Sequence, residues 1–127
     1  MAFREKDFIK RQLAEVARVI ARALGLKEAG QEDEARAVLE SGAAAALGVG
    51  YASLGAVDVA TALGLLRTRE GAEGYAQLLE CDANLEAEDG GDLARAESLR
   101  ARAHAIRAGA TSYIAPGFPT TRRNTPS

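Results

Sequence analysis

Tryptophan is missing from this chain, cysteine and histidine occur once each, and tyrosine and phenylalanine together number six in 127 residues. One cysteine, Cys81, cannot close an internal disulfide or supply the thiolate pairs of a zinc finger. Few aromatic and β-branched residues also disfavour a β-sheet. Alanine, in contrast, makes up roughly a fifth of the chain and has the highest helix propensity. We therefore predict a single all-α domain.

Long apolar runs are also scarce. The first residues are charged and no apolar leader segment follows them, so we expect a cytoplasmic protein. The most apolar stretch, residues 41–66, has the length of a membrane span but contains five glycines and Asp58. We expect no membrane span there.

Apolar residues at helical spacing predict about five helices, at residues 4–24, 31–47, 58–66, 70–88 and 92–108. Asp58 and Asp92 are expected N-caps, and Gly109 is expected to follow the end of the last helix. Glycines interrupt residues 48–57, for which we expect a loop or a broken helix. We divide the chain into a helical domain, 1–109, and an extended tail, 110–127, that contains all three prolines.

Two stretches share a helix, a turn with glycine and a polar residue, and a second helix with alanine four positions after that residue. They are centred on Gly30-Gln31 and Gly91-Asp92. These hairpins resemble tetratricopeptide repeats, in which small residues allow two helices to pack closely. The first match places suitable apolar or small residues at Val19, Ala23, Leu26, Ala35, Leu39 and Gly42. The order of segments is also similar to small bacterial helical proteins of unknown function. The resemblance implies antiparallel helical hairpins and no catalytic residues.

Few residues suggest catalytic chemistry. The glycines within 48–55 lack the spacing of a dinucleotide-binding loop, and residues 82–93 lack the glycine and final glutamate of a calcium loop. His104 is expected on an exposed face, and Cys81 is expected to be a small buried apolar residue between two acidic neighbours. We therefore expect no metal, no cofactor and no enzymatic activity.

Asp82 is the exception, because helical projection places it inside an apolar stripe with Tyr75 and leucines. A buried carboxylate needs a partner or a proton. The last predicted helix offers arginines on both flanks of its apolar face. We take Arg100 and Arg107 as candidate partners on one flank, and Arg95 and Arg102 on the other. A structural ion pair and a ligand-anchoring acid in a groove near Tyr51 are both open.

Charge is divided along the chain. Residues 1–27 carry seven basic and three acidic groups, residues 28–92 carry three and fourteen, and residues 93–127 carry six and one. This pattern is explained either by ion pairs between neighbouring helices or by pairing of two protomers into a homodimer. The acidic total and the lack of aromatic residues among the arginines disfavour nucleic acid binding.

The tail contains Tyr113, Ile114 and Phe118, which we expect to dock in an extended form against an apolar groove of this chain or of another protomer. For function, we predict a non-enzymatic interaction or scaffold module that self-associates. The alternative is a domain that binds a small ligand or a peptide in a groove near Tyr51, Tyr75 and Asp82. These two functions differ in the surface they need: a flat apolar helix face or a pocket with convergent polar groups.

Overall fold

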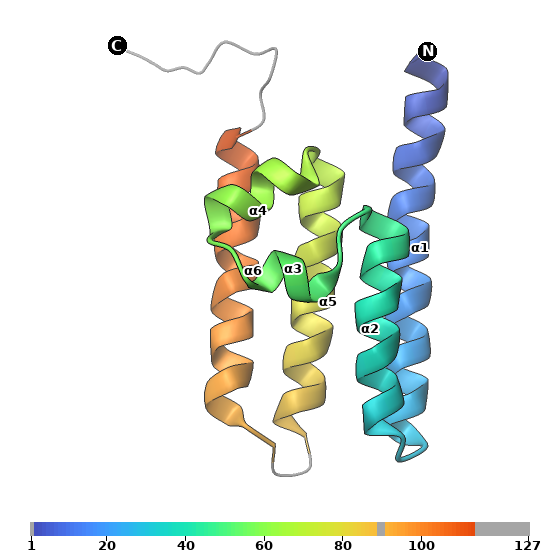
Figure 1. The fold of residues 1–127 in the computed structure, drawn as a ribbon, viewed down its shortest axis with the longest axis vertical. Helices are drawn as coiled ribbons and strands as arrows, with labels where there is room; N and C mark the ends of the chain where they lie inside the picture. The colour runs from blue at the N-terminus through green and yellow to red at the C-terminus, as the bar shows by residue number, and fades with distance from the viewer. Residues whose placement is uncertain (1, 89–90, 114–127) are drawn as a thin grey trace.

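The computed structural model describes the backbone of residues 2–88 and 91–113, and the side chains of 11–88 and 91–111. The described part of the chain is all-α, with six helices and no strand. The helices are α1 (Ala2–Glu28), α2 (Glu32–Leu47), α3 (Tyr51–Gly55), α4 (Val59–Leu66), α5 (Arg69–Ala87) and α6 (Leu93–Tyr113). Figure 1 shows α1 and α2 as one antiparallel pair and α5 and α6 as another, with the short helices α3 and α4 lying across the α5–α6 pair.

The first hairpin has a tight turn and a close helix contact. Gly30 has a positive φ of 81°, a conformation that favours glycine, and it connects α1 to α2. Gly42 lies against Val19 of α1, so that a Cβ at position 42 would be 2.5 Å from Val19 Cγ2. Gly42, one of the small residues of the first repeat match, therefore lies at a close contact between α1 and α2, where the Val19 side chain fills the space that the glycine leaves. Gly48, again with φ of 81°, ends α2 where the sequence predicts.

Residues 48–57 form a broken helix, as expected. The five-residue α3 lies between Gly50 and Ala56, and Glu40 of α2 accepts a hydrogen bond from the backbone N–H of Ala52 in its first turn. The N-cap of α4 is also confirmed, because Asp58 Oδ1 accepts from the backbone N–H of Thr61 at 3.1 Å. This hydrogen bond holds the pKa of the exposed Asp58 carboxyl below its ordinary value.

Helix α5 lies at the centre of the molecule and packs against α1, α2, α4 and α6. Its N-cap is Thr68, whose hydroxyl accepts from the backbone N–H of Gly71 at 2.9 Å. Small residues allow the neighbours to approach; a Cβ at Gly74 would be 3.0 Å from Val16 of α1. The largest fully buried side chains of the core are Tyr75, Leu39, Leu54, Leu78, Leu79, Ile106, Val16 and Asp82.

Helix α6 corrects the predicted boundary at residue 109. It begins after Asp92, whose Oδ1 accepts from the backbone N–H of Arg95 as expected, but it continues through Gly109 to Tyr113. A Cβ at Gly109 would lie 2.6 Å from Leu63 Cδ1, so this glycine serves the contact between α4 and α6 and does not end the helix. The division into 1–109 and 110–127 is thus wrong at its boundary by four helical residues.

The predicted docking of the tail lies outside what the structure describes. The backbone of Tyr113 belongs to α6, while its side chain and the whole of Ile114 and Phe118 are among the residues that are not described. Docking of this segment therefore stays a prediction. Within the described ranges, no helix combines the length and apolar character needed to cross a membrane.

Candidate functional site

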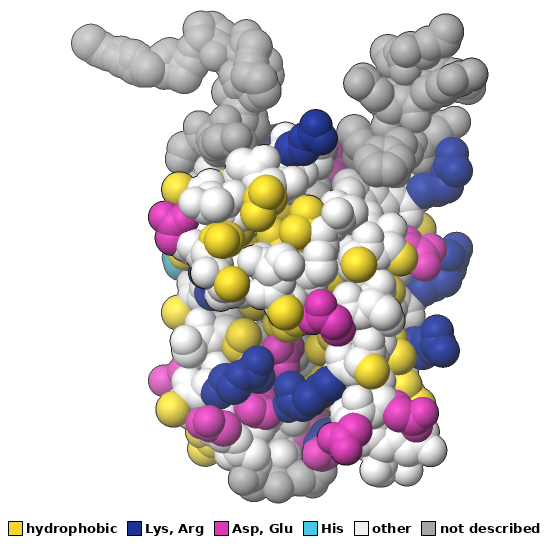
Figure 2. Space-filling model, in the orientation of Figure 1, with side chains coloured by type: hydrophobic (Ala, Val, Ile, Leu, Met, Phe, Trp, Pro, Cys, Tyr) yellow, Lys and Arg dark blue, Asp and Glu magenta, His cyan; other side chains and the backbone are white. Residues whose placement is uncertain are grey.

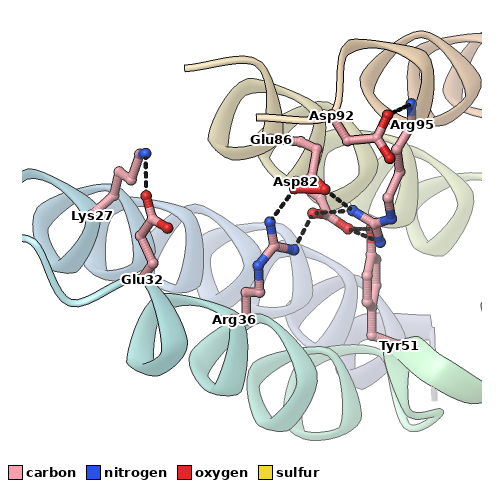
Figure 3. A network of polar contacts seen from close by, with 8 residues as sticks. All are labelled: Lys27, Glu32, Arg36, Tyr51, Asp82, Glu86, Asp92 and Arg95. Atoms are coloured by element: carbon pink, nitrogen blue, oxygen red, sulfur yellow. Dashed lines mark hydrogen bonds and ion pairs between the residues drawn. The ribbon is translucent and has the colours of Figure 1, made fainter. Parts of the chain in front are cut away.

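Asp82 of α5 is buried, with 1% of its surface exposed, and it has several hydrogen-bond donors around it (Figure 3). Arg95 of α6 donates from Nη1 to Oδ1 at 3.1 Å and from Nη2 to Oδ2 at 3.2 Å. Arg36 of α2 donates to Oδ1 at 3.0 Å, and the hydroxyl of Tyr51 donates to Oδ2 at 2.7 Å. The carboxylate thus joins α2, α3 and α6 to the central helix, and the expected burial and pairing of Asp82 are confirmed.

A second carboxylate, Glu86, completes the charge balance of this cluster. It lies one turn after Asp82 on α5 and accepts from Arg36 Nη2 at 2.5 Å. Its other oxygen is 3.5 Å from Arg95 Nη1. Two guanidinium groups therefore face two carboxylates. The hydrogen bonds that Arg95 donates to Asp82 raise the pKa of Arg95, and the negative charges of Asp82 and Glu86 raise it further. The cluster is electrically neutral as a unit.

Two tyrosines stand next to this cluster. The rings of Tyr51 and Tyr75 have centroids 6.0 Å apart and planes at 69°, an edge-to-face arrangement that aromatic pairs favour. Burial raises the pKa of Tyr51 far above its ordinary value, and the adjacent Asp82 carboxylate raises it further. Tyr51 therefore stays protonated and acts as a hydrogen-bond donor.

Arg102 of α6 binds the second of these tyrosines, Tyr75. Its Nε donates to the Tyr75 hydroxyl at 2.9 Å, and its Nη2 donates to the carbonyls of Leu54 at 2.6 Å and Val57 at 2.8 Å. These carbonyls belong to the C-terminal part of α3 and the residues after it. Arg102 therefore fixes the short helix α3 against the hairpin of α5 and α6.

Together these groups line a groove of about 580 Å³ between α2, α3, α5 and α6. Its apolar lining includes the partly exposed Leu99, with the buried Leu39 and Leu79 beneath it. Its polar lining includes the arginines and Tyr51 described above, with Tyr75 and Asp82 buried behind them. In Figure 2 basic and acidic side chains gather over the lower half of the face shown, below α3, and apolar side chains gather over α3 and α4. The volume and the mixed lining are typical of sites for small molecules.

The structure does not bring Arg100 and Arg107 to Asp82, so those two candidate partners were wrong. Arg100 donates to Asn84 at 3.1 Å, and Arg107 donates to Glu73 at 2.9 Å and to Glu80 at 2.6 Å. The cause is the antiparallel register of α5 and α6, which places Asp82 level with the first half of α6. Arg107 lies level with the first half of α5 and forms its own ion-pair cluster there.

Two arginines of the groove have roles that sequence reasoning did not find. Arg36 is 46 positions from Asp82 and lies on another helix, so helical spacing within α5 and α6 could not reveal it. Arg102 was also predicted as a candidate partner of Asp82, and this prediction was wrong. Arg102 donates to Tyr75 and to the carbonyls of Leu54 and Val57, and no local pattern fixes the position of α3 in space.

The remaining candidates are placed as expected. Cys81 is buried, and burial raises the pKa of its thiol to about 11, with a further contribution from Asp82. It is therefore a thiol, not a nucleophilic thiolate, at neutral pH. His104 is exposed on α6. Among the residues whose side chains are described, no group of three or more histidine, cysteine or acidic residues is arranged to hold a metal ion.

Comparison with known proteins adds no relative to this description: no protein-family model, no curated protein and no solved structure matches the chain.

Proposed function

We propose that this chain is a non-enzymatic binding domain that holds a small organic molecule in the groove between α2, α3, α5 and α6. The observation that carries the proposal is the groove itself, whose apolar surface is bordered by polar groups held in fixed positions. Asp82 orients Arg36, Arg95 and Tyr51, so these groups need little rearrangement when a ligand binds. Such preorganisation favours affinity because less side-chain entropy is lost.

The groove supports ligand binding more than catalysis. Its buried carboxylate already accepts four hydrogen bonds, from Arg36, Arg95 and Tyr51, and is held in an ion pair. Tyr51 keeps its proton because its pKa is raised. General acid–base catalysis needs a group that exchanges its proton near neutral pH, and Tyr51 does not have that character here. The arrangement instead provides fixed donors around an apolar surface.

A groove-filling substitution tests the proposal. Ser98 and Ala101 are both exposed on α6, but only Ser98 lines the groove. Ligand-observed NMR with phenyl- and naphthyl-bearing acids, amides and amines is expected to detect binding to the native chain. Ser98→Trp should abolish that binding because its indole occupies the groove, and Ala101→Trp should leave it unchanged. Equal binding to both variants, or no binding to the native chain by any fragment, contradicts the proposal.

Self-association is a second proposed function, and one observation favours it. Apolar side chains gather over α3 and α4 in Figure 2. Leu65, a residue of α4, is 42% exposed. Burial of this surface against a second copy would remove it from water. Light scattering at micromolar concentration should then give about twice the 13.3 kDa of one chain. Leu65→Ser should restore the single mass, whereas Leu93→Ser, at an exposed leucine of α6, should not; a native mass of one chain contradicts self-association.

A further inference from the structure

The arginines of the groove differ in the groups that balance their positive charge. Arg36 and Arg95 share the carboxylates of Asp82 and Glu86. Arg102, in contrast, donates only to neutral oxygens, namely the Tyr75 hydroxyl and two backbone carbonyls. Among the described side chains, no carboxylate lies within ion-pair distance of Arg102. The groove therefore contains one guanidinium whose charge no protein carboxylate balances at close range.

The guanidinium of Arg102 also has donors left for a ligand. An arginine has five N–H groups, and the protein engages the one on Nε and those on Nη2. The two on Nη1 form no hydrogen bond with the described residues. The charge of Arg102 contributes to lowering the pKa of the exposed Asp58, the N-cap of α4, but no ion pair joins the two side chains.

The surroundings of Arg102 define the rest of the ligand. Tyr51 and Leu99 are partly exposed in the groove with it, and Tyr51 stands edge-to-face against the fully buried Tyr75. These side chains offer an apolar and aromatic wall next to a positive charge. A molecule that fits this wall needs an apolar body with an anionic group at one end.

We propose that the groove binds a small organic acid, with its carboxylate on Arg102 and its aromatic or aliphatic body against Tyr51 and Leu99. This inference rests on the proposed small-molecule function and specifies the charge and polarity of the ligand. A carboxylate on a guanidinium forms charge-assisted hydrogen bonds, which are stronger than those of a neutral acceptor. A cationic ligand beside Arg102 is disfavoured, because Arg102 would repel it. Asp82 is already paired with arginines, and Glu40, the other carboxylate that lines the groove, accepts a hydrogen bond from the backbone N–H of Ala52.

Three isosteric probes test the charge of the ligand on the native chain. 4-Phenylbutyrate, 4-phenylbutanamide and 4-phenylbutylamine share one apolar body and end in an anion, a neutral amide and a cation. Titrations followed by amide chemical shifts should show the carboxylate binding at least about tenfold more tightly than the amide, and the amine binding most weakly. The largest shifts should lie at residues 51–57, 75 and 98–102. Added salt should reduce the preference for the carboxylate.

Substitutions of two arginines on α6 test the assignment to Arg102. Arg102→Gln should remove the preference for the carboxylate over the amide, whereas Arg100→Gln, which lies outside the groove, should keep it. Circular dichroism identifies an Arg102→Gln chain that fails to fold, in which case Arg102→Lys, which keeps the charge, should retain a reduced preference.

The outcomes separate this inference from the proposed function. If the amide binds the groove as tightly as the carboxylate, the groove is a binding site but the assignment of an organic acid is overturned. If the carboxylate preference persists in the folded Arg102→Gln chain, the role of Arg102 is overturned. If no probe shifts the groove residues and the fragment screen above also finds no ligand, the proposed function itself fails.

Discussion

Two clusters of arginines and carboxylates join α5 to its neighbours, and they differ mainly in burial. In the first, the Asp82 side chain is 2% exposed and its partners Arg36 and Arg95 are 40% and 41% exposed. In the second, Arg107 is 37% exposed, and its partners Glu73 and Glu80 are 38% and 45% exposed. The same side-chain chemistry thus occurs once around a buried anion and once on the surface.

The difference shows which cluster determines the arrangement of helices. A buried carboxylate has lost its water, so it depends on the protein for every hydrogen bond, and removing its partners is costly. A surface ion pair replaces hydrogen bonds that its side chains would otherwise form with water, so it contributes little to the free energy of unfolding. The Asp82 cluster should therefore fix α2, α3 and α6 around the groove, and the Arg107 cluster should be replaceable.

The largest effect is expected when both arginines of Asp82 are removed. The Arg36→Ala/Arg95→Ala double variant leaves the buried carboxylate with Tyr51 alone and should lose about 3–5 kcal/mol of unfolding free energy. Each single variant keeps one guanidinium on Asp82 and should lose less than half of that, so the effects are not additive. Urea denaturation at pH 7 measures all three chains.

A matched double variant shows whether burial is the cause. Arg100→Ala/Arg107→Ala also removes two arginines that contact α5, but their partners are on the surface. It should lose no more than about 2 kcal/mol. Equal losses in the two double variants would show that burial of Asp82 is not what distinguishes the clusters.

A smaller effect is expected when Asp82 itself is replaced. Asp82→Ala leaves a cavity beside Tyr75 and leucines, whereas Asp82→Leu fills much of it with apolar atoms. Arg36 and Arg95 are partly exposed, so they can regain water and keep Glu86 as a partner. Asp82→Leu should therefore be more stable than Asp82→Ala by at least about 1 kcal/mol in urea denaturation. If alanine is tolerated as well as leucine, the site is not packed as tightly as the structure indicates.

Sequence patterns predicted the elements of this fold better than their arrangement. Helical projection identified Asp82 as buried, and Asp58 and Asp92 as caps, because each of these inferences depends on residues within one helix. Gly109 misled the prediction because a glycine in a helix serves either an end or a close contact, and only Leu63 on another helix decides between them. The groove depends on contacts between four helices. Tyr51 was predicted as a groove residue, but Arg36 and the role of Arg102 were not, because their partners lie on other helices.

The smallest effect concerns the surface cluster and its response to acid. The hydrogen bond from Arg107 holds the pKa of Glu73 below its ordinary value of 4.5. The pKa of Glu73 is therefore higher in the unfolded chain than in the folded chain. The contribution of Glu73 to the unfolding free energy is complete above the unfolded pKa and is lost as the pH decreases through the folded pKa. Glu73→Gln should therefore cost less than about 1 kcal/mol at pH 7, because the pair is well exposed, and the cost should shrink as the pH falls below about 4.5. Urea denaturation at a series of pH values measures this against Glu97→Gln, an exposed residue of α6 without an ion pair among the described residues. A cost at Glu73 that is independent of pH would show that the loss comes from packing, and the surface cluster would then resemble the buried one more closely than its exposure suggests.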